Sequence, residues 1–376
     1  MKNFLLKTLI RFVPYLLWRA PKFSVSLLGL ISKNPNVKKL KSRPEMIARA
    51  GKSIATGGIL IAQLNVTNAC NQKCPMCNLW EEGTQMPLER VKLAIDRIAE
   101  LGSFMLTITG GEPFSHPDIA EIINYAHAKQ FWINVNTNAS IPLRHYQAVD
   151  LSKIDVAIVS MHAINENKLE KITGVKNTLP KVQQALHYFK ENSAMRIILK
   201  YVIQSGNDGE MEKVQEFADR EGFTVEYHPV MVGSTNRPVA TNKQELNLSQ
   251  EKLLTTLLTI QERKTHDKIF ESSVYYQFCI DAINRGSLSW KCDAGLNYLS
   301  IYPDGSFGIC KDIYTSAKIT DPDFIEKYHS QKFNEEMKNL REGCEGCNWS
   351  CYITASKMAH MIKNPNVADL AMLKSY

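Results

Sequence analysis

The chain has 376 residues, 44% hydrophobic and 22% charged, a composition that excludes a disordered or low-complexity protein. The net charge of +7 is uneven, because residues 1–52 carry twelve Lys/Arg and one acidic residue, Glu45, which leaves a net charge of −4 on the rest. A mildly acidic body lacks the basic surface typical of proteins that bind nucleic acid. The sequence has nine cysteines, mostly in close groups, and no clear secretory signal. This combination indicates metal or redox chemistry rather than disulfides.

The first 55 residues are predicted to form a basic amphipathic segment. On a helix its cationic side chains gather on one side, beside an interfacial tryptophan: Lys7, Arg11, Lys22 and Trp18. The longest charge-free run is too short to cross a bilayer, and Pro14 interrupts it. We therefore expect this segment to hold a cytoplasmic protein at an anionic membrane surface. The alternative is that it packs on the protein's own body, and a chain beginning near Gly57 is expected to stay folded.

Residues 56–235 alternate between the hydrophobic periods of strands and helices. Six apolar runs are predicted to be strands: residues 58–66, 104–109, 131–137, 154–160, 195–203 and 223–230. Four amphipathic segments between them are predicted to be helices: residues 87–102, 117–129, 178–192 and 210–222. Repeated β-α units predict an α/β fold with a parallel sheet. Six units are too few for a closed eight-stranded barrel, so we expect an incomplete (β/α)6 barrel with ligands at the carboxyl ends of its strands.

Three cysteines follow the first predicted strand, in the stretch "NACNQKCPMCNLW": Cys70, Cys74 and Cys77. Zinc sites usually take four protein ligands, whereas three thiolates on a [4Fe–4S] cube leave one iron open for a small molecule. The alternative is a zinc loop that takes a fourth ligand from a distant part of the chain. The second predicted strand ends in "GGEP", residues 110–113, at the same edge of the sheet.

The spacing of these cysteines, together with "GGEP" and the six β-α units, resembles the radical S-adenosylmethionine (radical SAM) superfamily. The resemblance covers roughly residues 56–235. It implies that the open iron binds SAM and that an electron, from a donor such as flavodoxin or ferredoxin, cleaves SAM to methionine and a 5′-deoxyadenosyl radical. That radical would abstract a hydrogen atom from an unknown substrate, as in an oxidoreductase or a related enzyme.

The resemblance also implies which residues contact SAM. One contact is the main chain at Met76. The others are the "GGE" at the end of the second strand (Gly110, Gly111 and Glu112) and three residues at other strand ends (Thr137, Ser160 and Met231). A strand-end cap is the alternative for Ser160, and a core side chain is the alternative for Met231. His162 and His228 are the acid/base candidates because both follow or end a predicted strand, although capping or packing would explain either.

Residues 236–285 are predicted to be a helical linker, in which Cys279 is a buried core thiol. In residues 286–376, "YPDG" predicts a hairpin between Cys292 and Cys310. Three further cysteines follow: Cys344, Cys347 and Cys351. This arrangement resembles a twitch domain, the shorter relative of the SPASM domain, which implies an auxiliary [4Fe–4S] cluster. The implied ligands are Cys292, Cys310, Cys344 and Cys347, with Cys351 as a replacement, and a structural zinc site is the alternative.

Three functions follow from these patterns. The first is a radical SAM enzyme that acts on a small molecule or a lipid at the membrane. The second is the same chemistry on a ribosomally made peptide, and the third is a non-enzymatic iron–sulfur or zinc protein.

Overall fold

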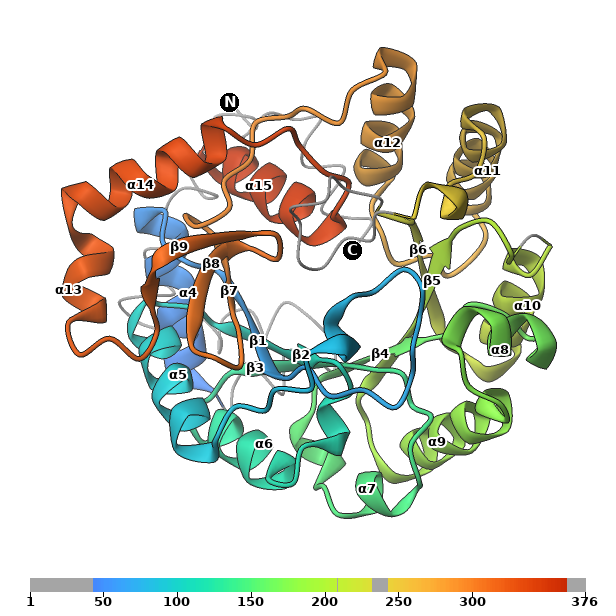
Figure 1. The fold of residues 1–376 in the computed structure, drawn as a ribbon, viewed down its shortest axis with the longest axis horizontal. Coiled ribbons are helices and arrows are strands. Elements are labelled where there is room, and N and C mark those ends of the chain that lie inside the picture. The colour runs from blue at the N-terminus through green and yellow to red at the C-terminus, as the bar shows by residue number, and fades with distance from the viewer. Residues whose placement is uncertain (1–42, 208, 232–242, 364–376) are drawn as a thin grey trace, which may run out of the picture.

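The computed structural model describes residues 43–207, 209–231 and 243–363 (Figure 1). Its sheet has the order β6-β5-β4-β3-β2-β1-β7-β8-β9. The six predicted strands form and pair in parallel: β1 (Ile61–Thr67), β2 (Met105–Gly110), β3 (Trp132–Thr137), β4 (Val156–Ser160), β5 (Arg196–Ile203) and β6 (Thr224–Pro229). The predicted incomplete barrel is therefore confirmed.

Helices cover the outside of the curved sheet (Figure 1). They are α5 (Leu88–Glu100), α6 (Ile119–Ala128), α7 (Arg144–Gln147), α8 (Glu166–Thr173), α9 (Thr178–Asn192) and α10 (Met211–Glu221). Short 3-10 turns lie between elements: Leu79–Glu81, Pro113–Ser115, Leu151–Lys153 and Gln244–Leu246. The sequence did not predict α8, a two-turn helix that begins where the side chain of Asn165 accepts a hydrogen bond from the amide of Lys168.

The predicted C-terminal hairpin forms, and it continues the barrel sheet. Strand β7 (Tyr298–Ile301) lies parallel to β1, while β8 (Ser306–Cys310) and β9 (Ile313–Lys318) extend the edge in antiparallel fashion. Five helices complete the described chain: α11 (Gln250–Arg263), α12 (Ser273–Arg285), α13 (Phe324–His329), α14 (Gln331–Glu342) and α15 (Ser350–Lys363). No helix in residues 43–363, apart from the omitted positions, is long and apolar enough to cross a bilayer.

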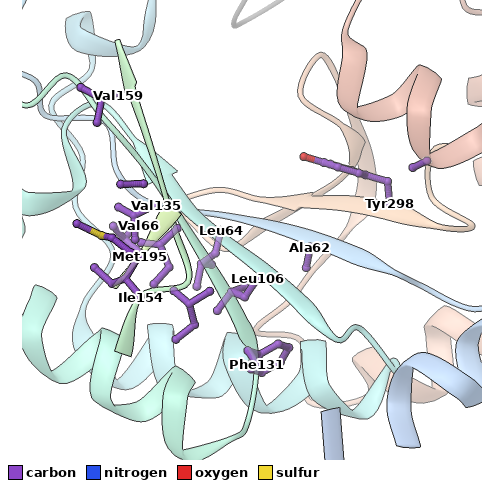
Figure 2. Close-up of a cluster of buried hydrophobic side chains, with 14 of the residues drawn as sticks. Ala62, Leu64, Val66, Leu106, Phe131, Val135, Ile154, Val159, Met195 and Tyr298 are labelled. Atoms are coloured by element: carbon purple, nitrogen blue, oxygen red, sulfur yellow. The ribbon is translucent and has the colours of Figure 1, made fainter. Parts of the chain in front are cut away.

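The two faces of the parallel strands differ in polarity. One face packs into the main hydrophobic core against the helices, as Leu64, Leu106 and Val135 do in Figure 2. Because side chains alternate along a strand, the intervening residues face the inside of the barrel. Those residues are largely polar: Gln63, Asn65, Thr107, Thr109, Asn134, Asn136, Ser160, Lys200, Glu226 and His228. The barrel therefore has a polar interior, which a purely structural core would not need.

A helix before β1 packs on the barrel. In α4 (Pro44–Thr56), Met46 and Ile47 are buried against Phe104 and Trp132 of the barrel. The boundary at residue 55 and the folding of a chain that begins near Gly57 stay predictions, and this packing argues against the second. Residues 1–42, which hold most of the predicted amphipathic segment, lie outside the described residues.

Arg43 shows why the barrel needs the residues before β1. Its Nη1 atom lies 2.5 Å from Oδ2 of Asp155 and donates to the carbonyl of Phe131 at 2.7 Å. Arg43 and Asp155 are both buried, and Asp155 also accepts from the amide of Ile133 at 2.9 Å. Removal of the arginine would leave a carboxylate inside the fold without its cation, which is far more costly than losing a surface pair.

Arg43→Met is therefore expected to lower the free energy of unfolding by about 3–5 kcal/mol. Lys52→Met is the matched control, because Lys52 lies exposed on α4 and its loss should change the value by less than about 0.5 kcal/mol. Urea titration of both variants under anaerobic conditions, followed by circular dichroism, measures the difference. Equal midpoints for the two variants would mean that the Arg43–Asp155 pair does not support the barrel.

Candidate active site

The three-cysteine loop begins where β1 ends, at the carboxyl edge of the sheet. Cys70, Cys74 and Cys77 are all half-buried. The loop is held by hydrogen bonds, from the amide of Cys77 to the carbonyl of Cys74 at 3.1 Å and from the amide of Lys73 to the carbonyl of Thr173 at 2.8 Å. The second bond attaches the loop to the end of α8, so this helix supports the cysteines.

The two glycines of "GGEP" lie against the start of the cysteine loop. The amide of Gly111 donates to the carbonyl of Thr67 at 2.7 Å, and the amide of Glu112 donates to that of Ala69 at 2.9 Å. A Cβ atom on Gly110 would lie 1.9 Å from the Thr67 oxygen, and one on Gly111 would lie 2.2 Å from the Ala69 oxygen. Both positions therefore require glycine because the backbone of the cysteine loop comes too close for a side chain. This requirement is independent of the predicted SAM contact.

Gly111→Ala is expected to displace the cysteine loop, since the added methyl group meets backbone rather than a movable side chain. The iron content of the purified protein should fall, and SAM cleavage should fall by at least about a hundredfold. Gly343→Ala is the control, because a Cβ there would lie an ordinary 3.4 Å from the carbonyl oxygen of Asn339. The iron content and the yield of 5′-deoxyadenosine are measured for both variants. Wild-type values for Gly111→Ala would show that Gly111 is not needed to hold the cysteine loop in place.

Glu112 organises the strand ends around the cysteine loop. Its buried carboxylate accepts hydrogen bonds from the amides of Phe114 at 3.1 Å and Asn138 at 2.7 Å, and from the hydroxyl of Thr137 at 2.9 Å. Burial raises the pKa of Glu112 to about 7, although these hydrogen bonds oppose the shift. Asn138 in turn donates to Sγ of Cys70 at 3.5 Å. Glu112 and Thr137 therefore reach the cysteine loop through Asn138.

Without a metal, the buried thiols of the loop would favour the protonated form. Burial raises the pKa of Cys70 to about 11, and it raises the pKa values of Cys74 and Cys77 as well. The like charges of Cys77 and Cys70 raise the pKa of Cys74 further. Iron ligation would supply the positive charge that keeps all three as thiolates. Three closely spaced thiolates with no fourth cysteine in the loop fit a [4Fe–4S] cluster that has one open iron.

Three C-terminal cysteines share one local geometry. The sulfurs of Cys292, Cys310 and Cys344 each accept a hydrogen bond, at 3.4 Å, from the amide two residues further along. Amide hydrogen bonds to sulfur stabilise thiolate ligands of iron–sulfur clusters. After the larger effect of burial, neighbouring cysteines also raise the pKa values of Cys292, Cys310 and Cys347.

Cys351 has different surroundings. Its thiol lies at the hydroxyl of Tyr298 and near the ammonium groups of Lys311 and Lys200. Burial raises its pKa, and the two lysines oppose that shift. Cys351 also lies close enough to Cys347 to raise the pKa of that thiol, after the larger effect of burial. Cys292, Cys310, Cys344 and Cys347 remain the predicted ligand set, with Cys351 as the replacement.

The remaining residues of the predicted site are spread along the strand ends. Met76 packs on the small core around Leu169 of α8, which leaves its main chain for the predicted SAM contact. Ser160 is the last residue of β4, and Met231 is buried just after β6. His162 accepts a hydrogen bond at Nδ1 from the amide of Val202, and burial lowers its pKa to about 4. This neutral, bonded histidine fits the capping alternative better than an acid/base role.

The structure brings charged residues to the site that the sequence analysis missed. Lys200 of β5 lies 3.0 Å from Glu226 of β6, and both face the barrel interior with His228. Lys311 lies 4.5 Å from the ring of Trp349, and its charge opposes the rise in the pKa of both Cys77 and Cys351. Charged residues within the apolar runs 195–203 and 223–230 were the available signal, because alternation places them on the inner face.

Comparison with known proteins agrees with this geometry. Residues 64–218 match the family model of the radical SAM superfamily. The chain is 26% identical over 218 residues to Fe-coproporphyrin III synthase of Methanosarcina barkeri, covering 56% of this chain and only 53% of that protein. It is 23% identical over 297 residues to GTP 3′,8-cyclase of Helicobacter pylori, covering 74% of this chain and 86% of that protein.

Solved structures share the fold at low sequence identity. SuiB of Streptococcus suis has a TM-score of 0.62 at 14% identity, covering 89% of this chain and 81% of that one. The anSMEcpe structure with bound AdoMet has a TM-score of 0.57 at 16% identity, covering 83% and 99%. The family match covers the end of β1, the cysteine loop and strands β2 to β5, where the expected chemistry resides. Residues 64–218 therefore form a radical SAM domain.

Proposed function

We propose that this protein cleaves SAM at a [4Fe–4S] cluster on Cys70, Cys74 and Cys77 and directs the resulting radical to a polar small molecule inside the barrel. The observation behind this proposal is the three-thiol loop held by "GGE" above a polar barrel interior. When bound, such a cluster supplies the electron that splits SAM into methionine and a 5′-deoxyadenosyl radical, which abstracts hydrogen from the substrate.

The chain's own residues would position these reactants and exclude water. Glu112 holds the strand ends of β2 and β3 together, so that the cysteine loop has one arrangement. Ser160 and Met231 lie at strand ends from which they would contact SAM. The loop from Cys347 to Cys351 lies over β6, where Asn348 donates to the carbonyl of Pro229 at 3.4 Å. This loop would limit access of water from the C-terminal side.

A second [4Fe–4S] cluster on Cys292, Cys310, Cys344 and Cys347 is part of the proposal. The repeated amide-to-sulfur hydrogen bonds support Cys292, Cys310 and Cys344 as ligands, and Cys351 is the alternative to Cys347 as the fourth. Structural zinc is the competing occupant, because four thiolates suit either metal. Under this proposal residues 286–376 act as a twitch-like auxiliary-cluster unit, although β7 pairs directly with β1.

A small polar substrate is favoured over a ribosomally made peptide. The two relatives described above are Fe-coproporphyrin III synthase and GTP 3′,8-cyclase, and both names refer to small molecules. SuiB, which has also been solved with the precursor peptide SuiA, resembles this chain at the level of the fold alone. The inner barrel face carries Lys200, Glu226 and His228, which would meet polar groups of a substrate. A lipid substrate would then have to present its polar head to the barrel.

Anaerobic assay of reconstituted protein with SAM and dithionite tests the proposal. Formation of 5′-deoxyadenosine and methionine is expected, and their absence in iron-replete protein would overturn it. Addition of cell extract separated into small-molecule, lipid and peptide fractions should raise the yield only with the fraction that holds the substrate. Stimulation by the peptide fraction alone would favour the maturase alternative.

The predicted membrane association rests on the charge of the N-terminal segment alone. Co-sedimentation of the full chain with anionic and with neutral vesicles tests it, and pelleting with anionic vesicles that weakens in high salt is expected. Equal, negligible pelleting with both kinds of vesicle would exclude the association.

A further inference from the structure

Three buried side chains from two segments converge beside the end of β6. Nε2 of His228 lies 3.5 Å from Oε1 of Glu226 and 3.4 Å from Oε1 of Glu271. One donor atom from each residue lies within 4.8 Å of the other two. The exposed fractions are 3% for Glu226, 5% for His228 and 4% for Glu271, so bulk water does not reach the group. The cysteine groups contribute no residue to it.

The contacts within this group do not include a hydrogen bond. Although Nε2 of His228 has a carboxylate oxygen on either side, it has no hydrogen-bond partner among the described residues. Ligands of a tetrahedral ion with bonds of about 2.0–2.2 Å are separated by about 3.3–3.6 Å. The two distances from His228 fall in that range, and the two carboxylate oxygens lie within 4.8 Å of each other.

The other nitrogen of His228 is already oriented for such a role. The hydroxyl of Tyr275 donates its single proton to the carbonyl of Asn348 at 3.0 Å, and its oxygen lies 3.4 Å from Nδ1 of His228. Nδ1 of His228 is therefore close to an oxygen of a neighbouring side chain, and Nε2 is the nitrogen that lies near the two carboxylates. Metal-bound histidines usually have this arrangement, in which the second nitrogen donates to an oxygen.

The charges around the group leave one carboxylate without a dedicated cation. Lys200 lies 3.0 Å from Glu226. Glu271 has no lysine or arginine within ion-pair distance among the described residues. Burial of two ionised carboxylates beside a single lysine is costly, and a bound cation would relieve that cost.

We propose that Glu226, His228 and Glu271 bind one divalent transition-metal ion, separate from both iron–sulfur sites. Two carboxylates and an imidazole suit Mn²⁺, Fe²⁺ or Zn²⁺ rather than a thiolate-seeking ion. Three protein ligands leave at least one position for an exogenous oxygen ligand, as in catalytic rather than structural metal sites. The position faces the barrel interior because Glu226 and His228 alternate with the core residues Val225 and Tyr227.

Manganese is the probe for the test, because it prefers oxygen and nitrogen to the thiolates of the iron–sulfur sites. Iron-replete full-length protein, treated with a chelator and oxidised so that its clusters are EPR-silent, is titrated with Mn²⁺ while free Mn²⁺ is followed by EPR. One tight site per chain is expected, from which Zn²⁺ displaces the manganese. Glu271→Gln and His228→Gln should each weaken binding by at least about a hundredfold, without loss of iron.

Lys200→Met separates a metal site from a plain buried ion cluster. Loss of its ammonium removes a like charge next to the ion, so Mn²⁺ binding should tighten by about tenfold. Glu342→Gln, which alters an exposed carboxylate of α14, should leave binding unchanged and controls for surface binding. No tight site in folded wild-type protein, or equal binding in wild type and Glu271→Gln, would overturn the proposal and identify His228 as an imidazolium that neutralises Glu271.

Discussion

Cys74→Ala is expected to lower SAM cleavage by at least about a hundredfold, because two thiolates cannot hold a four-iron cube with a single open iron. Cys74 is the central cysteine of the loop, and burial together with the charges of Cys77 and Cys70 raises the pKa of its thiol. Iron must be bound to keep such a thiol deprotonated as a thiolate ligand, so cluster binding and the ligand state of the loop are coupled. Production of 5′-deoxyadenosine under anaerobic reduction measures the effect.

The control for this prediction is Cys279→Ala. Cys279 is buried in α12 within the main hydrophobic core, apart from both cysteine groups, as the sequence predicts for a core thiol. Its loss should reduce stability slightly and leave 5′-deoxyadenosine formation near the wild-type level. Normal SAM cleavage by Cys74→Ala would contradict the assignment of the loop as the cluster site.

The second large effect concerns the number of iron atoms. Reconstituted wild-type protein is expected to hold about eight irons per chain, as two four-iron cubes. A variant without Cys70, Cys74 and Cys77 should keep about four, because the C-terminal cysteines form a separate group. Iron and zinc are measured together by inductively coupled plasma mass spectrometry. One zinc and no iron in the triple variant would show that the C-terminal site is structural zinc.

A pair of variants tests which C-terminal cysteines are ligands. Cys347→Ser should lower the iron content from about eight to about four, because Cys347 lies near Cys292 and Cys344 and belongs to the predicted ligand set. Cys351→Ser should keep about eight, since that thiol lies at Tyr298 and the lysines. The reverse result would make Cys351 the ligand.

Local patterns were sufficient for the elements of the barrel. The bounds predicted for the helix of residues 178–192 are those of α9, because a continuous amphipathic pattern between turn residues determines a helix locally. The six strands were predicted for the same reason, with ends that differ by one to three residues. The cysteine loop could also be predicted from the sequence, since its three thiols are close in sequence and must be close in space.

Contacts between distant segments were beyond those patterns. In the sequence, Arg43 is one of many basic residues of the N-terminal segment. Its partner Asp155 is 112 residues away, so the sequence does not show that the two form a buried pair. Nothing in the hairpin signal of "YPDG" showed that β7 would pair with β1 across more than 200 residues. Such pairings depend on the free energy of the assembled core, which no window of sequence contains.

The sequence by itself determined the repeated β-α units, the three-thiol loop and "GGE" at one edge of the sheet, because these follow from periodicity and spacing. Only the tertiary structure decided which side chains share the barrel interior. Lys200, Glu226 and Glu271 lie on separate segments, and they meet because β5 pairs with β6 and because residues next to Ile269 run beside β6. Burial then gives these charges effects that they lack on a solvated surface, and burial is a property of the fold rather than of any one segment.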